Sequence, residues 1–220
     1  IYYNPGYFRA KLLVEGQIVK EHDLFLKSNG WLGTLDYSPI PKYFQPEIKG
    51  GRMTIPEEIE EEVEASDKML ISTYHYVNDL GNISDDHFTF TAQVENHSEE
   101  TWAVCKMMSL YFLGSEGALA IPFSKIGCSS DNNLMLNDVY LDGKENDLSA
   151  LSSDFSGATD IKVSVDQKKV TVSIQGQEVY TQAYNMSIGK LVGFRFRFLG
   201  TGKVNQVHLF DKNEAEISLD

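Results

Sequence analysis

The chain's 220 residues are enough for one large β domain or two small ones, with a hydrophobic core that needs no metal or disulfide. Nineteen Lys and Arg against 32 Asp and Glu give a net charge of −13, which excludes a general binder of nucleic acid or anionic membrane. With 42% hydrophobic residues and no run of about 18 apolar ones, the composition is that of an ordinary globular chain.

The first 28 residues contain two predicted strands, at 8–14 and 17–26. A hairpin alone is marginal in water, so we interpret residues 1–28 as the second half of a small module. Ser28-Asn29-Gly30 marks a boundary, after which 30–215 form the main domain and 216–220 a tail. Since residue 1 is Ile, we expect a processed or truncated piece, with a signal or membrane anchor outside this chain.

One segment early in the main domain has helical rather than strand periodicity. Thr54 and Glu57 have capping-box spacing, Pro56 lies in the first turn, and Ile55, Ile59 and Val63 share a face. A short helix is predicted from this pattern, with its many glutamates on a solvated face; the alternative is a cation site or a partner surface.

The rest of the main domain shows the period-two pattern of half-buried strands. Phe88, Phe90, Ala92 and Val94 alternate with polar residues, and 161–165 with 170–174 form a hairpin. Further strands are predicted at 69–76, 102–113, 118–123, 134–141, 178–181, 192–198 and 203–210. About a dozen short strands separated by Gly, Asn and Asp predict an all-β antiparallel sandwich of the jelly-roll type.

Two segments carry resemblances to known families. The run from Asn4 to Leu12, with Pro5-Gly6, resembles a late strand of PKD-type immunoglobulin-like modules. The run 188–198, followed by Gly200-Thr201-Gly202, resembles the closing strands of laminin-G-like, concanavalin A-like jelly rolls. The pairing resembles surface or periplasmic proteins of Bacteroides-type bacteria. The resemblance implies an exported protein but no particular activity, because these folds include lectins, hydrolases and spacers.

Searches for catalytic motifs give no candidate. The glucanase pattern Glu-x-Asp-x-x-Glu is begun by Glu145-Asn146-Asp147 but meets Ala150 where its last acid should be, and the segment is typical of a loop. No Gly-x-Ser-x-Gly, zinc-ligand spacing or phosphate loop is present. Carboxylates from separate strands remain an alternative route to a glycoside hydrolase.

Calcium is the one cofactor that the sequence suggests. Asp79 with Asp85 and Asp86, or Asp131-Asn132-Asn133, supply hard oxygen ligands at short range. The alternative is an ordinary Asx-rich turn.

A ligand-binding sheet face is predicted from two alternating strands. Tyr74 and Tyr76 share one face of their strand, and Arg195 and Arg197 project opposite the phenylalanines of theirs. Such aromatic and planar polar groups suit a carbohydrate or protein partner. The alternatives are sheet packing for the tyrosines and a solvated face for the arginines.

Cys105 and Cys128 lie 23 positions apart, a spacing that fits either two thiols or one bridge, and the unpaired state is the expectation. Together these observations predict an extracellular, cell-surface or periplasmic, non-catalytic module that binds a glycan or a protein. The alternatives are the glycoside hydrolase and a structural spacer or sensor ectodomain of a membrane protein.

Overall fold

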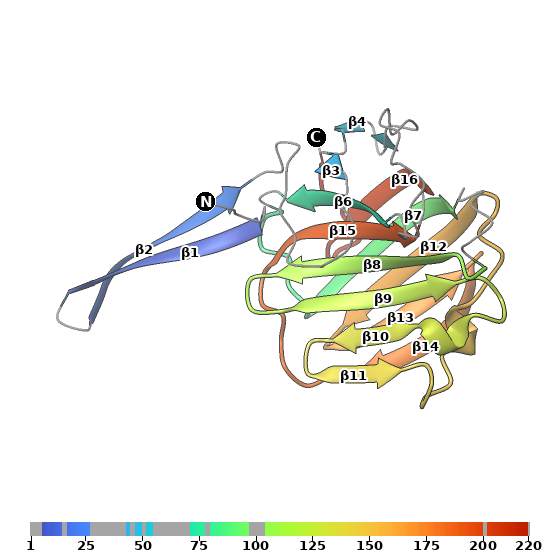
Figure 1. Cartoon of the computed structure of the whole chain (residues 1–220). Helices are drawn as coiled ribbons and strands as arrows, with labels where there is room; N and C mark the ends of the chain where they lie inside the picture. Colours follow the sequence, from blue (N-terminus) through green and yellow to red (C-terminus); the bar gives the residue numbers. More distant parts are fainter. Residues whose placement is uncertain are drawn as a thin grey trace, which may run out of the picture.

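The computed structural model describes residues 6–14, 17–26, 43–44, 47–49, 52–54, 71–77, 80–96, 104–199 and 202–219. Most of them form two packed sheets (Figure 1). One sheet has seven strands in the order β11-β10-β9-β8-β15-β6-β3, and the other has five in the order β14-β13-β12-β7-β16. Within the described residues, no helix is both long and apolar enough to cross a membrane.

The strands of the seven-stranded sheet are β3 (Tyr43–Phe44), β6 (Ile71–Val77), β8 (Met107–Gly114), β9 (Ala118–Ser124), β10 (Asn133–Leu136), β11 (Val139–Asp142) and β15 (Leu191–Leu199). Those of the five-stranded sheet are β7 (His87–Asn96), β12 (Thr159–Asp166), β13 (Lys169–Ile174), β14 (Gln177–Ala183) and β16 (Gly202–Phe210). Two short 3-10 helices, η1 (Ser129–Asp131) and η2 (Ser149–Leu151), lie in connections.

The chain passes repeatedly between the two sheets, from β6 to β7 to β8 and again from β14 to β15 to β16. All neighbours pair antiparallel except β3 with β6. This connectivity confirms the predicted all-β jelly-roll sandwich.

The core between the sheets follows from the alternation seen in the sequence. In β7 the even-numbered residues from Phe88 to Asn96 are buried, and the intervening polar residues are partly exposed. The Phe90 ring lies 5.3 Å from Phe112 and 5.0 Å from Phe194, both edge-on, so the two sheets meet through aromatic contacts.

Two tight turns interrupt the strands in different ways. The predicted strand 134–141 is divided into β10 and β11 by Asn137, whose φ of 52° is a conformation that asparagine tolerates. The hairpin of β12 and β13 is confirmed, and its turn residues Gln167 and Lys168 have φ of 46° and 60°. This is the backbone of a type I′ turn, made here without glycine or asparagine.

The amino-terminal strands pair as predicted. The strands β1 (Gly6–Val14) and β2 (Gln17–Leu26) form an antiparallel hairpin with a bulge between Leu12 and Leu13. In Figure 1 this hairpin extends away from the sandwich. Its assignment to a PKD-like module stays a prediction.

The strands β4 (Glu47–Lys49) and β5 (Arg52–Thr54) form a second small hairpin. The helix predicted from Thr54 onward lies outside the described residues, apart from Thr54 itself, which ends β5.

The expectation of unpaired cysteines was wrong, because Cys105 and Cys128 form a disulfide with a Cα–Cα separation of 5.5 Å. Cys105 precedes β8 and Cys128 precedes η1. Pairing of β8 with β9 brings these two segments together, since Met107 lies opposite Ser124. A separation of 23 positions in the sequence gives no sign of this proximity.

Replacing both cysteines by serine should lower the free energy of unfolding by about 3 kcal/mol, because the bridge closes a loop of about two dozen residues in the unfolded chain. Urea denaturation of the wild type with and without a reductant, and of the double variant, measures this. Identical midpoints for all three samples would contradict it.

Candidate functional site

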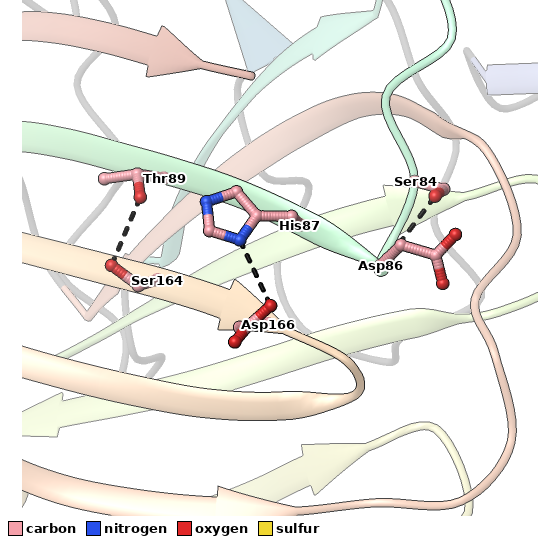
Figure 2. A network of polar contacts seen from close by, with 6 residues as sticks. All are labelled: Ser84, Asp86, His87, Thr89, Ser164 and Asp166. Carbon is pink, nitrogen blue, oxygen red and sulfur yellow. Dashed lines mark hydrogen bonds and ion pairs between the residues drawn. The ribbon is translucent and has the colours of Figure 1, made fainter. Parts of the chain in front are cut away.

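The outer face of the five-stranded sheet is polar, and its side chains bond to one another. Across β7 and β12, His87 Nδ1 lies 3.2 Å from Asp166 Oδ1, and the hydroxyls of Thr89 and Ser164 are 3.3 Å apart (Figure 2). The neighbouring pair Gln93 and Asp160 is linked similarly, at 3.1 Å. A face whose polar groups bond laterally in this way is suited to contact with water.

The outer face of the seven-stranded sheet is different in character. The strand register aligns one residue from each of five strands, and we call this set the outer row: Arg195, Tyr111, Ala120, Met135 and Tyr140. Four strand spacings give the row a length of about 19 Å. Its members are a planar guanidinium, two tyrosines, a methionine and an alanine, and its only charge is that of Arg195.

Side-chain contacts fix both ends of the outer row. The Arg195 guanidinium carbon lies 3.6 Å from the centre of the Tyr111 ring, a cation–π contact that orients the guanidinium plane. At the other end Tyr140 is 62% exposed, and its hydroxyl donates to Asn133 Oδ1 at 2.7 Å. The row therefore presents planar groups whose positions are set by the sheet itself.

The four ligand-binding residues predicted from the sequence do not lie on one face. The Tyr76 ring stacks on Phe194 at 4.9 Å, and its hydroxyl donates to the Leu219 carbonyl at 2.9 Å, so Tyr76 packs against the core and the carboxyl-terminal segment. Arg195 and Arg197 lie on the outer face, where Arg197 is opposite Ser109. For Tyr74 the structure gives only its backbone place in β6, opposite Phe196.

Of the predicted calcium ligands, Asp85 is almost completely buried, at 1% exposure. Its carboxylate accepts hydrogen bonds from the hydroxyls of Tyr184 (3.1 Å) and Ser187 (2.7 Å) and from the Ile188 amide (3.1 Å). Burial, and then the adjacent Asp85 charge, raise the pKa of Tyr184 far above its usual value, so its hydroxyl remains a donor.

The other predicted calcium ligands, Asp79 and Asp86, do not join Asp85 in a metal-binding cluster within the described residues. Asp86 is exposed, and its amide donates to Ser84 Oγ at 3.3 Å (Figure 2). Asp79 lies outside the described residues. No group of three or more His, Cys, Asp or Glu in the described part of the chain is arranged to hold a metal ion.

The donors to Asp85 lie in the connection between β14 and β15. A second carboxylate, Asp138, is exposed and bonds to the same connection. It accepts hydrogen bonds from the amides of Asn185 and Met186 and from the Asn185 side chain, all at 3.0 Å. These bonds, that of Met186 first, lower the pKa of Asp138 below its usual 3.8.

A cavity of about 270 Å³ opens at the end of the sandwich opposite Asp85. We call it the end pocket, and it is lined by Asn96, Lys106, Lys125, Asp154, Phe155 and Ser156. Asn96 ends β7 and Lys106 precedes β8, so the pocket lies where these two strands meet the end of the sandwich.

Sequence reasoning missed the end pocket because its residues come from four separate segments with no motif spacing. The only signal was the nearness of Lys106 to Cys105 and of Lys125 to Cys128. The partial glucanase pattern Glu145-Asn146-Asp147 falls in a turn, as predicted, and contributes nothing to the pocket lining.

Comparisons with known proteins concern the fold. No family model matches the sequence, and no curated protein is significantly similar to it. Among solved structures, alginate lyase AlyC3 has a TM-score of 0.35 and 12% identity over 64% of this chain and 74% of that chain. The Bacillus licheniformis β-glucanase has a TM-score of 0.34 and 10% identity, over 64% of this chain and 68% of that chain. Domains LG4-5 of the mouse laminin alpha1 chain have a TM-score of 0.37 and 10% identity, over 67% of this chain and 40% of that chain. Scores and identities this low carry no argument about activity or substrate.

Replacing Asp85 by asparagine should lower the free energy of unfolding by about 2–4 kcal/mol, because an amide nitrogen would face groups that now donate to a buried carboxylate. The matched control is Asp86→Asn, one residue away and exposed, which should change it by about 0.5 kcal/mol or less. Urea denaturation compares the two, and equal effects would contradict the structural role of Asp85.

The lowered pKa of Asp138 makes its contribution to stability pH-dependent. Ionised Asp138 is favoured in the folded state, so its contribution is present above pH 3.8 and is lost as the pH falls through the lower folded value. The melting temperature, measured from pH 6 to pH 2, should therefore decline less steeply in Asp138→Asn than in the wild type. The exposed Asp131→Asn variant serves as the control, and identical slopes for all three proteins would refute the assignment.

Proposed function

We propose that this protein is an exported, non-catalytic module that binds a glycan chain along the outer row of the seven-stranded sheet. The observation that carries the proposal is the stacking of Arg195 on Tyr111 at 3.6 Å, in register with Tyr140 at the sheet edge. Sugar rings have apolar faces and hydroxyl edges, so they bind to surfaces that combine aromatic rings with planar donors.

The dimensions and chemistry of the row support this assignment over a compact ligand. A length of about 19 Å spans several sugar rings. Ala120, between Tyr111 and Met135, is only 5% exposed, so the accessible surface of the row comes from the larger side chains on either side of it. The Arg195 guanidinium is held against the Tyr111 ring before the ligand arrives, which reduces the entropy lost on binding.

Export is supported by the disulfide, because bridges of this kind persist in oxidising compartments such as the periplasm and the extracellular space.

A glycoside hydrolase is the less favoured alternative. Hydrolysis needs two carboxyl groups about 5–10 Å apart across the scissile bond. Among the described residues, the end pocket has a single carboxylate in its lining, that of Asp154, and the outer row has none.

The proposal is tested by calorimetric titration of an oligosaccharide panel against the wild type, Tyr111→Ala and Arg195→Ala. Each substitution should weaken binding by about tenfold or more, as expected for the loss of an aromatic or cationic anchor. Thr89→Ala, on the opposite outer face, is the matched control and should bind like the wild type.

Absence of binding across the panel, or equal losses in Thr89→Ala, would contradict glycan binding by the outer row. If Tyr111→Ala and Arg195→Ala instead abolish capture of a protein, the row is a protein-binding face and the glycan assignment is wrong. The melting temperature of each variant verifies that it is folded.

A further inference from the structure

The end pocket combines a buried floor with cationic walls. Phe155 and Asn96 are 5% and 2% exposed, and they are joined by a hydrogen bond from the Asn96 amide to the Phe155 carbonyl at 2.8 Å. The Phe155 ring packs edge-on against Phe123 in the core, with centroids 5.8 Å apart. The Asn96 side-chain amide donates to the Met107 carbonyl at 3.3 Å. The floor is therefore fixed by the sandwich and leaves only a small apolar surface of Phe155 at the bottom of the pocket.

The two lysines of the pocket are held next to each other by the backbone. The Lys125 amide donates to the Lys106 carbonyl at 3.0 Å, and the Cys128 amide donates to the Lys125 carbonyl at the same distance. The disulfide joins the residues immediately beside them, since Cys105 precedes Lys106 and Cys128 lies three positions after Lys125. The backbone thus keeps the two lysines close together at the pocket. The hydrogen bonds that do so come from main-chain groups, so the fold itself does not require lysine at either position.

In the described part of the chain, these ammonium groups make no direct contact with an acid. Hydrogen bonds from Ser156, and then the charges of Lys125 and Lys106, lower the pKa of Asp154, so this carboxylate lies within electrostatic reach of both lysines. Across residues 80–96, 104–199 and 202–219, no ion pair or side-chain hydrogen bond involves the Nζ atom of Lys106 or Lys125. Asp154 is the acid of the lining, and its carboxylate accepts a hydrogen bond from the Ser156 amide at 3.0 Å. The described residues of the pocket lining therefore carry a net positive charge within a chain whose total charge is −13.

We propose that the end pocket binds the oxyanion group of a small acidic saccharide, with Lys106 and Lys125 on the anion and the sugar ring against Phe155. At physiological ionic strength charges more than about 8 Å away are largely screened, so the local lysine pair, not the net charge, decides the sign of the ligand. A volume of about 270 Å³ is near the lower end for ligand pockets and suits one sugar ring. The site is separate from the outer row and does not depend on glycan binding there.

The experiment titrates the whole chain with D-glucuronate, D-glucose and inorganic sulfate at matched ionic strength, and follows the backbone amide resonances by NMR. Glucuronate should shift the amides of Lys106, Lys125 and Ser156, whereas glucose should bind at least tenfold more weakly. Sulfate distinguishes the two sources of an oxyanion. Weaker binding of sulfate supports a sugar-borne group, and binding as tight as that of glucuronate would overturn the saccharide assignment in favour of a free inorganic anion.

Substitutions within the pocket test the charge assignment with opposite signs. Lys106→Gln and Lys125→Gln should each weaken glucuronate binding by about tenfold, the effect of losing one charged hydrogen bond. Asp154→Asn should strengthen it severalfold, because it removes the competing charge and keeps an acceptor for the Ser156 amide. Lys162→Gln, an exposed lysine on β12, is the matched control and should have no effect.

Equal binding of glucose and glucuronate, or unchanged binding in both lysine variants, would overturn the proposal. Tyr111→Ala separates this result from that of the outer row, because it should leave the glucuronate shifts intact. A loss of those shifts in Tyr111→Ala would place the anion on the outer face and overturn the end-pocket assignment.

Discussion

The buried carboxylate of Asp85 is the constraint on which one end of the sandwich depends. A charge at 1% exposure is tolerated only when hydrogen bonds compensate for the lost water, and here they come from Tyr184, Ser187 and Ile188. These donors lie in the connection from β14 to β15, which crosses from one sheet to the other. The carboxylate therefore links folding of the five-stranded sheet to correct placement of β15 between β8 and β6 in the seven-stranded one.

The segment before β7, which contains Asp85 and Asp86, also holds the turn between β12 and β13. The amides of Gln167 and Lys168 donate to the carbonyls of Asp86 and Asp85, at 2.7 and 3.2 Å. Both turn residues have positive φ, a conformation that costs free energy for side chains other than glycine and asparagine. Hydrogen bonds from outside the hairpin offset that cost, which explains how a Gln-Lys turn forms where Asn-Gly is the usual choice.

Alternation in the sequence was sufficient to predict the sandwich, because buried strands such as β7 and β15 repeat large apolar residues at every second position. It also placed Arg195 and Arg197 opposite the core. It could not predict that Tyr76 faces the core, since a tyrosine suits either face of a sheet and the choice is made by Phe194 across the strand pair. Alternation could not predict the disulfide or the end pocket either, because both depend on which strand ends, distant in the sequence, lie together in the fold.

Sequence motifs overstated the chemical role of the acids. Asp85 was predicted as a calcium ligand from its neighbours in the chain, yet its oxygens are occupied by protein donors from about a hundred positions away. An Asx-rich segment looks the same in a sequence whether its carboxylates point to solvent, to a metal or into the protein. Only long-range partners distinguish these cases.

The strand β7 runs the full length of the sandwich, from the Asp85 loop to Asn96 at the end pocket, a span of about 30 Å. The interactions that close one end and the side chains that line the other therefore share no contacts and are energetically independent at this separation. Selection can change Lys106, Lys125 and Asp154 at the end pocket without disturbing the Asp85 end of the fold. A sandwich built in this way is a suitable starting point for the divergence of new ligand preferences.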